Sequence, residues 1–256
     1  MKYIFGAGIT AAAAMLLYMG YKANDIKEKR HVIQLKTVKG FRPFKLVFLA
    51  DIHRKKLPEN FLASPVDAIV IGGDLTERGV PMQRTAENLR ILTAAAPVYF
   101  VWVNHEYYSG ERNLRKLLNH YGVKILENES VELFGDTHLK LVGVDFYTEA
   151  EEKMGSAFSE VYENDTVLFA AHSPANFKWV EDHGTPHLMM AGHLHGGQIR
   201  LGKLGLFQTG SLSKQGSGWE LVTNGYGTRM LPLRLGAEAQ YHVLDIYPDL
   251  VGHPGG

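Results

Sequence analysis

The stretch LVFLADIH, residues 46–53, decides the fold class. Its first five residues are apolar without alternation, which is typical of a strand buried on both faces of a sheet. Asp51 and His53 follow directly, and both lie on one side of an extended backbone because side chains there alternate with a period of two. The stretch therefore predicts a buried strand that ends in a pair of side chains able to grip one ion.

Four more apolar runs of this kind occur along the chain: Ala68 to Ile71, Val98 to Val103, Val167 to Ala171 and Leu188 to Ala191. Amphipathic segments predict helices between them, over Met82 to Ala95, Glu111 to Tyr121 and Pro174 to about Asp182. An antiparallel pair is expected for residues 131–134 and 139–144, with a last strand over 241–246. Strands that alternate with helices predict an α/β fold.

Polar side chains follow each buried run. They are Asp51 and His53, then Asp74, then Asn104, His105 and Glu106, then His172, and finally His193 and His195. Carboxyl ends of strands in an α/β sheet line the crevice where ligands bind, so these residues are expected to converge. The chain has no cysteine, so a metal there must be bound by oxygen and imidazole, a set that suits Mn²⁺, Fe, Zn²⁺, Mg²⁺ or Co²⁺.

This ligand chemistry predicts phosphoester hydrolysis. Two neighbouring ions activate water near neutral pH and neutralise phosphoryl oxygens, and Asp74, after a Gly-Gly turn, is the candidate carboxylate that bridges them. The sequence contains no phosphate-binding Walker loop, no Gly-x-Ser-x-Gly motif and no thiol nucleophile. The 27 basic and 27 acidic residues also disfavour a nuclease with a broad basic surface.

These blocks, in this order, resemble the calcineurin-like metallophosphoesterase superfamily over roughly residues 45–246. Gly192-His193-Leu194-His195-Gly196-Gly197 and Asn224-Gly225-Tyr226-Gly227 are similar to its membrane-associated, YkuE/YaeI-like phosphodiesterase branch. The resemblance implies a four-layer αββα sandwich. Val103 departs from the pattern, because the family usually has Gly before Asn-His.

The resemblance also implies roles for the residues. Asp51, His53 and His195 would bind one metal, Asn104, His172 and His193 would bind the other, and Asp74 would bridge both. His105 would contact the phosphate or protonate the leaving oxygen, with Glu106 orienting it, and an imidazole has a pKa suited to that proton transfer. Two divalent ions are expected as cofactors, with Mn²⁺ favoured. Arg54 and Arg200 are candidate substrate contacts; for Arg54 a solvated loop is the simpler interpretation.

The amino terminus differs from the rest. No charged residue occurs from Tyr3 to Tyr21, and about 20 apolar residues suffice for a transmembrane helix. The sequence therefore predicts a membrane anchor over residues 1–22, a linker over 23–31, a catalytic domain over 32–250 and a tail over 251–256. A cleaved signal peptide is the alternative, and the charges that flank the segment leave its orientation open.

The predicted protein is thus a single-pass, cell-membrane phosphodiesterase or pyrophosphohydrolase acting on a small or lipid-linked phosphate ester. A phosphomonoesterase is one alternative. The other is a catalytically silent, membrane-tethered binding protein of the same fold. Nucleic acid is not favoured as a partner.

Overall fold

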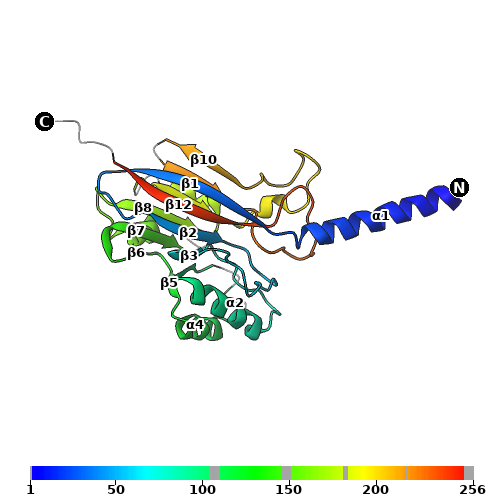
Figure 1. Cartoon of the computed structure of the whole chain (residues 1–256), viewed down its shortest axis with the longest axis horizontal. Helices are drawn as coiled ribbons and strands as arrows, with labels where there is room; N and C mark the ends of the chain where they lie inside the picture. The colour runs from blue at the N-terminus through cyan, green and yellow to red at the C-terminus, as the bar shows by residue number, and fades with distance from the viewer. Residues whose placement is uncertain are drawn as a thin grey trace.

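The computed structural model describes residues 2–103, 106, 110–145, 151–180, 184–216 and 218–250. Asn104 and His105, two of the predicted site residues, lie outside this part of the chain. The described residues form two six-stranded sheets that face each other, with helices on their outer surfaces (Figure 1).

The first sheet has the order β1-β12-β2-β3-β4-β5. Its strands are β1 (Lys27–Thr37), β12 (Gln240–Leu250), β2 (Phe44–Leu49), β3 (Ala68–Ile71), β4 (Val98–Val101) and β5 (Lys124–Leu126). β12 is antiparallel to β2, whereas every other neighbouring pair is parallel. Because β2, β3 and β4 are parallel, the loops that follow them all leave from the same edge.

The second sheet has the order β10-β11-β9-β8-β7-β6. Its strands are β10 (Ser211–Gln215), β11 (Gly218–Val222), β9 (Leu188–Ala191), β8 (Thr166–Ala171), β7 (Asp136–Val144) and β6 (Glu129–Leu133). The strands β7, β8, β9 and β11 are parallel, and the two outer pairs are antiparallel hairpins. The loops after β8 and β9 therefore also share one edge.

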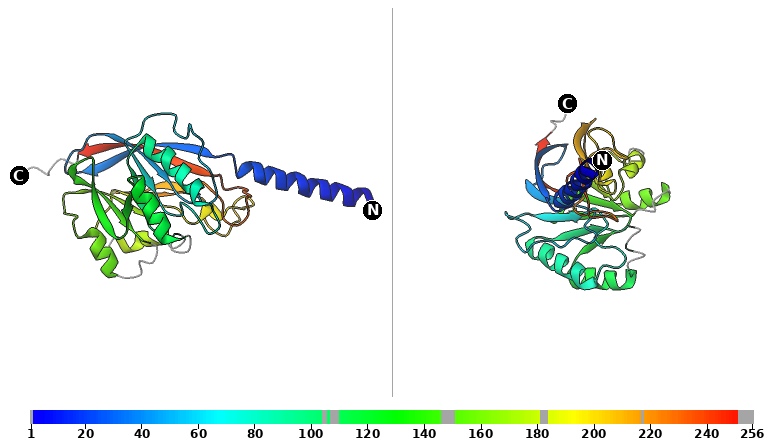
Figure 2. Two further views of the ribbon diagram at one scale, coloured as in Figure 1. Left: turned by 90° about the horizontal axis from the view of Figure 1, so that it is seen from below. Right: turned by 90° about the vertical axis from the view of Figure 1, so that its right-hand side faces the viewer.

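Three hydrophobic clusters hold the layers together. One lies between the sheets and joins side chains such as Phe48 and Leu244 of the first sheet to Leu168 of the second. A second cluster packs α2 (Met82–Ala95) and α4 (Glu111–His120) on the outer face of the first sheet. A third packs α5 (Glu151–Phe158) and α6 (Phe177–Val180), which follows the 3₁₀ turn η1 (Pro174–Asn176), on the second. Figures 1 and 2 show this order of layers, which agrees with the expected αββα sandwich.

The helix α1 (Lys2–Lys22) projects from one end of the body (Figures 1 and 2). In the part of the chain that the structure describes, no helix is long and apolar enough to cross a membrane. The transmembrane segment predicted for residues 1–22 is therefore not supported, although those residues do form a helix from Lys2 onward. The predicted cell-membrane location stays a prediction.

The predicted linker over 23–31 is wrong in its second half, because β1 starts at Lys27. This strand lies at the edge of the sheet, where charged side chains stay in water, and its buried positions begin only at Ile33. An edge strand with one wet face lacks the continuous apolar run that marks the central strands. The strand β5 and the helix α5 escape sequence prediction as well, because both are short.

Histidines on β1 and β12 predict a loss of stability in mild acid. His31 Nε2 lies 3.1 Å from His242 Nδ1. Burial lowers the pKa of His242 to about 3, and the charges of His31 and Lys29 act in the same direction. Below about pH 6.5 the imidazole at position 242 is protonated in the unfolded chain but stays neutral in the folded protein. The free energy of unfolding therefore decreases as the pH falls. Urea midpoints measured between pH 7 and pH 5 should show it, with a slope of at most about 1.4 kcal/mol per pH unit from this group.

The variant His242→Gln should show a shallower pH dependence than the wild type. His120→Gln, at an exposed position at the end of α4, should keep the wild-type dependence. Equal slopes in all three proteins would contradict the assignment to His242.

Candidate metal centre

The ends of four parallel strands bring the predicted ligands together. Asp51 follows β2, Asp74 follows β3, His172 follows β8, and His193 and His195 follow β9. The first two strands belong to one sheet and the last two to the other. The centre therefore lies where the carboxyl edges of both sheets meet, as the sequence predicts.

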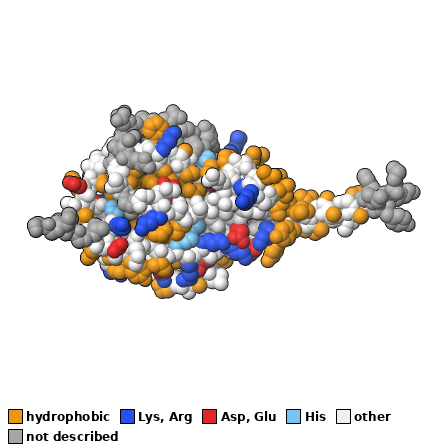
Figure 3. Space-filling model, turned by 90° about the horizontal axis from the view of Figure 1, so that it is seen from above, with side chains coloured by type: hydrophobic (Ala, Val, Ile, Leu, Met, Phe, Trp, Pro, Cys, Tyr) orange, Lys and Arg blue, Asp and Glu red, His pale blue; other side chains and the backbone are white. Residues whose placement is uncertain are grey.

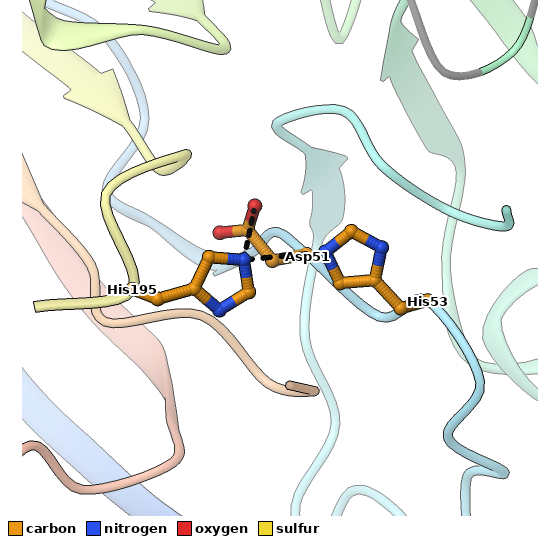
Figure 4. A group of neighbouring side chains, drawn as sticks. All are labelled: Asp51, His53 and His195. Atoms are coloured by element: carbon orange, nitrogen blue, oxygen red, sulfur yellow. Dashed lines mark hydrogen bonds and ion pairs between the residues drawn. The ribbon is translucent and has the colours of Figure 1, made fainter. Parts of the chain in front are cut away.

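One group consists of Asp51, His53 and His195 (Figure 4). The Nε2 atoms of the two imidazoles lie 3.2 Å apart, and His195 Nε2 lies 3.5 Å from Asp51 Oδ1. All three side chains are buried. This is the triad that the family resemblance assigns to one metal.

A second group consists of Asp51, Asp74 and His172. His193 joins it, because its Nδ1 lies 2.9 Å from His172 Nε2. Asp51 is thus shared by both groups, whereas the sequence assigns it to one metal only. Asn104, the remaining predicted ligand, lies outside the described residues.

Asp74 lies between the two groups. Its Oδ2 is 3.5 Å from His53 Nε2 and also 3.5 Å from His172 Nε2. The carboxylate is nearly fully buried. This is the position that a bridging ligand requires.

The backbone at the site is held in an unusual conformation. Asp51, His53, Asp74, His193 and His195 all have positive φ, between 49° and 72°. L-residues other than Gly adopt this region rarely, and such outliers cluster at functional sites. The conformational strain is tolerated where a turn has to orient a functional side chain. Here five of the nine described non-Gly residues with positive φ are predicted ligands.

Glycines leave room for the Asp51 carboxylate. A Cβ at Gly192 or at Gly225 would each lie 2.7 Å from Asp51 Oδ2. Gly225 also has a φ of +79°, which favours glycine. The segments around Gly192 and Gly225 can therefore approach this carboxylate closely, because the two glycines have no side chain in the way. The His193 amide also donates a hydrogen bond to Asp51 Oδ2 at 3.1 Å.

The protonation of His172 is set by its surroundings. Its Nδ1 donates to the Gly72 carbonyl at 2.8 Å, which leaves Nε2 facing Asp74 and His193. Burial acts to lower the pKa of His172, but the charge of Asp74, a hydrogen bond to it and the charge of Asp51 together raise it to about 9. A divalent ion at Nε2 must displace that proton, so metal binding should strengthen as the pH rises towards 9.

Glu77 is a partner of the site that sequence reasoning missed. Its Oε2 lies 3.2 Å from His53 Nδ1, and the same carboxylate pairs with Arg54. Burial acts to lower the pKa of His53, whereas the contact with Glu77 and the charge of Asp74 raise it. A carboxylate on Nδ1–H fixes the ring and keeps Nε2 free for a metal. The position of Glu77, three residues after Asp74, carries no pattern that could have signalled this role.

Glu77→Ala is expected to weaken Mn²⁺ binding by roughly 10–100-fold, because the His53 ring loses its anchor. Glu77→Gln should lose less, since an amide oxygen still accepts from Nδ1–H. Titration calorimetry with Mn²⁺ measures both. Glu87→Ala, which removes a partly exposed helix carboxylate paired with Lys56, is the matched control. Wild-type affinity in Glu77→Ala would show that the contact with His53 has no positioning role.

Arg234, also missed from the sequence, supports His195 from behind. Its fully buried guanidinium donates to the His195 carbonyl and lies 3.4 Å from His195 Nδ1. Burial lowers the pKa of His195 to about 4, and the charges of His53 and Arg234 act in the same direction. His195 is therefore neutral at pH 7, the form in which imidazole binds a metal.

Glu106 is fully buried beside the centre. Its Oε1 accepts from the Leu75 amide at 3.0 Å, directly after Asp74. Burial raises the pKa of Glu106 well above its usual range, and the charge of Asp74 adds to the effect. The carboxyl group is thus placed to hold the turn that carries Asp74. Its predicted contact with His105 lies outside the described residues.

The two arginines predicted to contact substrate are differently placed. Arg54 is exposed and pairs with Glu77, next to His53. Arg200 is buried, and its guanidinium donates to the carbonyls of Gly196, Lys203 and Phe207. These contacts give Arg200 a structural role in its own loop, and its contact with substrate stays a prediction.

The side chains present fit a divalent metal. Two nitrogen ligands of one ion are about 3 Å apart, which matches both the 3.2 Å and the 2.9 Å imidazole pairs. Asp51 Oδ1 is buried and accepts no hydrogen bond from any described residue. Carboxylate and imidazole together suit Mn²⁺, Fe, Zn²⁺ or Co²⁺.

Comparison with known proteins agrees with this chemistry. Residues 44–197 match the family model for the calcineurin-like phosphoesterase. The chain is 33% identical over 249 residues to the uncharacterized protein YpbG of Bacillus subtilis, covering 95% of this chain and 96% of that protein. It is 29% identical over 178 residues to phosphodiesterase YaeI of Escherichia coli, covering 64% of each chain. It is also 26% identical over 227 residues to an uncharacterized metallophosphoesterase of Helicobacter pylori, covering 81% of this chain and 60% of that protein.

The family resemblance predicted from the strand-end motifs is therefore confirmed. With a matching model over most of the α/β body and candidate ligands converging at its strand ends, this chain belongs to the calcineurin-like phosphoesterase family and is a hydrolase of phosphate esters.

Proposed function

We propose that this hydrolase works with two divalent ions, Mn²⁺ being favoured, and cleaves a phosphodiester or a pyrophosphate. The observation that carries the proposal is the position of Asp74 Oδ2, 3.5 Å from one imidazole of each group. One ion would be held by Asp51, His53 and His195, with Asp74 as the bridge. The other would be held by Asn104, His172 and His193.

The ions would supply an activated water molecule and would neutralise the phosphoryl oxygens. The protein residues would set the spacing of the two ions, orient their ligands and supply a proton. Asp74 fixes the spacing of the two groups, Glu77 and Arg234 hold His53 and His195 in orientation, and Glu106 holds the turn after Asp74. His105 donates the proton that the leaving oxygen needs, a role that suits an imidazole with a pKa near neutrality.

Diester cleavage is supported by the name of one relative, phosphodiesterase YaeI, at 29% identity. The test uses the full chain, because a fragment starting at Val32 would remove the first five residues of β1. Turnover of bis-p-nitrophenyl phosphate and of p-nitrophenyl phosphate is measured with Mn²⁺, Fe²⁺, Zn²⁺, Mg²⁺ and Co²⁺. A higher kcat/KM for the diester supports the proposal.

A higher kcat/KM for the monoester would favour the phosphomonoesterase alternative. A protein that binds two equivalents of metal yet turns over neither compound, nor a pyrophosphate-linked nucleotide, would favour the silent binding protein.

A further inference from the structure

Exposed apolar side chains gather at the end of the body from which α1 projects. Two loops lie there: the first, residues 198–210, connects η2 (His195–Gly197) to β10, and the second, residues 223–239, connects β11 to β12. Leu206 on the first loop is 87% exposed, and Met230 on the second loop is 88% exposed. The other exposed members are Ile199, Leu201, Leu204 and Phe207 on the first loop, Leu231 on the second, and Leu16, Leu17 and Tyr18 on α1. We call these residues the apolar end. Figure 3 shows hydrophobic side chains around the base of α1 and along it.

Hydrogen bonds join the three segments of the apolar end. The Arg234 amide donates to the Met19 carbonyl at 3.0 Å, which fixes the second loop to α1. The Gln198 side chain donates to the carbonyls of Arg229 and Leu231, which fixes the first loop to the second. In Figures 1 and 2 both loops lie at the end of the body from which α1 projects.

The first loop is held rigidly with its apolar side chains outward. The buried Arg200 guanidinium donates to the carbonyls of Gly196, Lys203 and Phe207, so it spans the loop from within. The space it fills is left by Gly205, where a Cβ would lie 2.5 Å from an Arg200 nitrogen. The arginine thus occupies the interior of the loop, and the leucines lie exposed outside it. Contiguous apolar surface of this kind marks an interaction site.

Charge indicates what covers the apolar end. No Asp or Glu occurs in residues 1–24, 184–219 or 221–237, the three segments that contain it. Lys203 and Arg229 are exposed on the two loops, and neither forms an ion pair with another described residue. A second copy docked through the same face would bring these positive charges together. An anionic bilayer surface offers both an apolar interior and negative head groups.

We propose that the apolar end docks on an anionic lipid surface, with the leucines of the first loop and Met230 entering the acyl region. The inference is independent of catalysis, since docking needs neither metal nor turnover. It has a consequence for the site, because the first loop starts directly after His195 and is joined to the second loop through Gln198. Docking would therefore bring the metal centre to the level of the lipid head groups.

The absence of native cysteine allows a direct test. Leu206→Cys, labelled with a polarity-sensitive fluorophore, is mixed with vesicles of phosphatidylcholine alone or in equal parts with phosphatidylglycerol. We expect a blue shift and brighter emission with the anionic vesicles. The matched control is labelled Tyr162→Cys, whose side chain is similarly exposed away from the apolar end. It should not respond.

A second measurement separates the loops from α1. Leu204→Ser/Leu206→Ser/Met230→Ser in the full chain should float with anionic vesicles at least about tenfold less than the wild type. Tyr162→Ser/Leu250→Ser is the control, and unchanged Mn²⁺ binding shows that the fold is kept. Wild-type flotation of the triple variant, or no spectral response at Leu206→Cys, would overturn the proposal. The proposal would also be overturned if the wild type formed a dimer, the triple variant were a monomer, and neither bound vesicles. Loss of turnover alone bears on the proposed function and not on docking.

Discussion

Asp74→Ala is expected to remove metal binding at both groups and to lower kcat/KM by roughly a thousandfold or more. The reason is the position of its carboxylate, which faces His53 on one side and His172 on the other at equal distance. Asp51 also belongs to both groups, but Asp74 Oδ2 is the carboxylate oxygen that lies 3.5 Å from both His53 Nε2 and His172 Nε2. Metal content by mass spectrometry and diester turnover measure the two effects separately.

The loss should occur without loss of fold. Asp74 is buried near Asp51 and Glu106, so its removal relieves repulsion between like charges when no metal is present, but it also removes the counter-charge of a protonated His172. These two effects oppose each other, so the unfolding midpoint of the metal-free variant should stay close to that of the metal-free wild type. Asp249→Ala, at an exposed position on β12, serves as the control and should keep metal and activity.

His105→Ala provides the contrast. It should keep both metals and lose about 10²–10⁴-fold in turnover, which is the contribution of a general acid. If both Asp74→Ala and His105→Ala lose metal equally, His105 is a ligand and its assigned role is wrong.

Arg234→Met is expected to destabilise the protein by about 3–5 kcal/mol. The Arg234 guanidinium is fully buried and donates to six backbone carbonyls, those of His195, Asn224, Gly225, Gly227, Ala237 and Glu238. Methionine fills the volume but leaves buried acceptors without donors. Because these carbonyls belong to the segments around His195 and Asp51, metal affinity should fall as well.

Arg234→Lys should recover part of the stability only, since an ammonium group has three donors and lacks the planar fork of guanidinium. Arg90→Met is the matched control: it removes an exposed arginine paired with Glu59 and should change the free energy of unfolding by less than about 0.5 kcal/mol. Urea midpoints at constant Mn²⁺ and again with chelator measure the effects on stability and on metal affinity. Equal midpoints for the Arg234→Met and Arg90→Met variants would contradict the role of the buried hydrogen bonds.

The parts of the fold that the sequence predicts are those whose pattern is local. The runs at Ala68–Ile71 and Leu188–Ala191 and the helix Met82–Ala95 have the predicted bounds, because burial on both faces and a proline at the helix start leave clear marks. The convergence of Asp51, His53, Asp74, His172 and His195 could be expected for the same reason, since each follows such a run within four residues. β1 was not, because an edge strand is shaped by a partner far along the chain.

Support of the site was harder to predict than the site itself. Glu77 and Arg234 act through contacts with His53 and His195 that depend on how loops from both sheets meet. Neither residue stands in a motif. Arg234 is buried yet forms no ion pair with any carboxylate among the described residues, which is contrary to what its residue type suggests. Only the three-dimensional arrangement reveals that backbone carbonyls replace the missing anion.

The place of β12 in the first sheet has a consequence for biosynthesis. β12 is the last of the described strands and lies between β1 and β2, with Lys27 opposite Gln240 and Phe44 opposite Ile246. Until residues 240–250 leave the ribosome, β1 and β2 have no partner between them, and their exposed edges are open to wrong pairing. Such long-range pairing slows folding. The nascent protein should therefore depend on chaperones until residues 240–250 have emerged, and a truncation before β12 should aggregate instead of yielding a smaller domain.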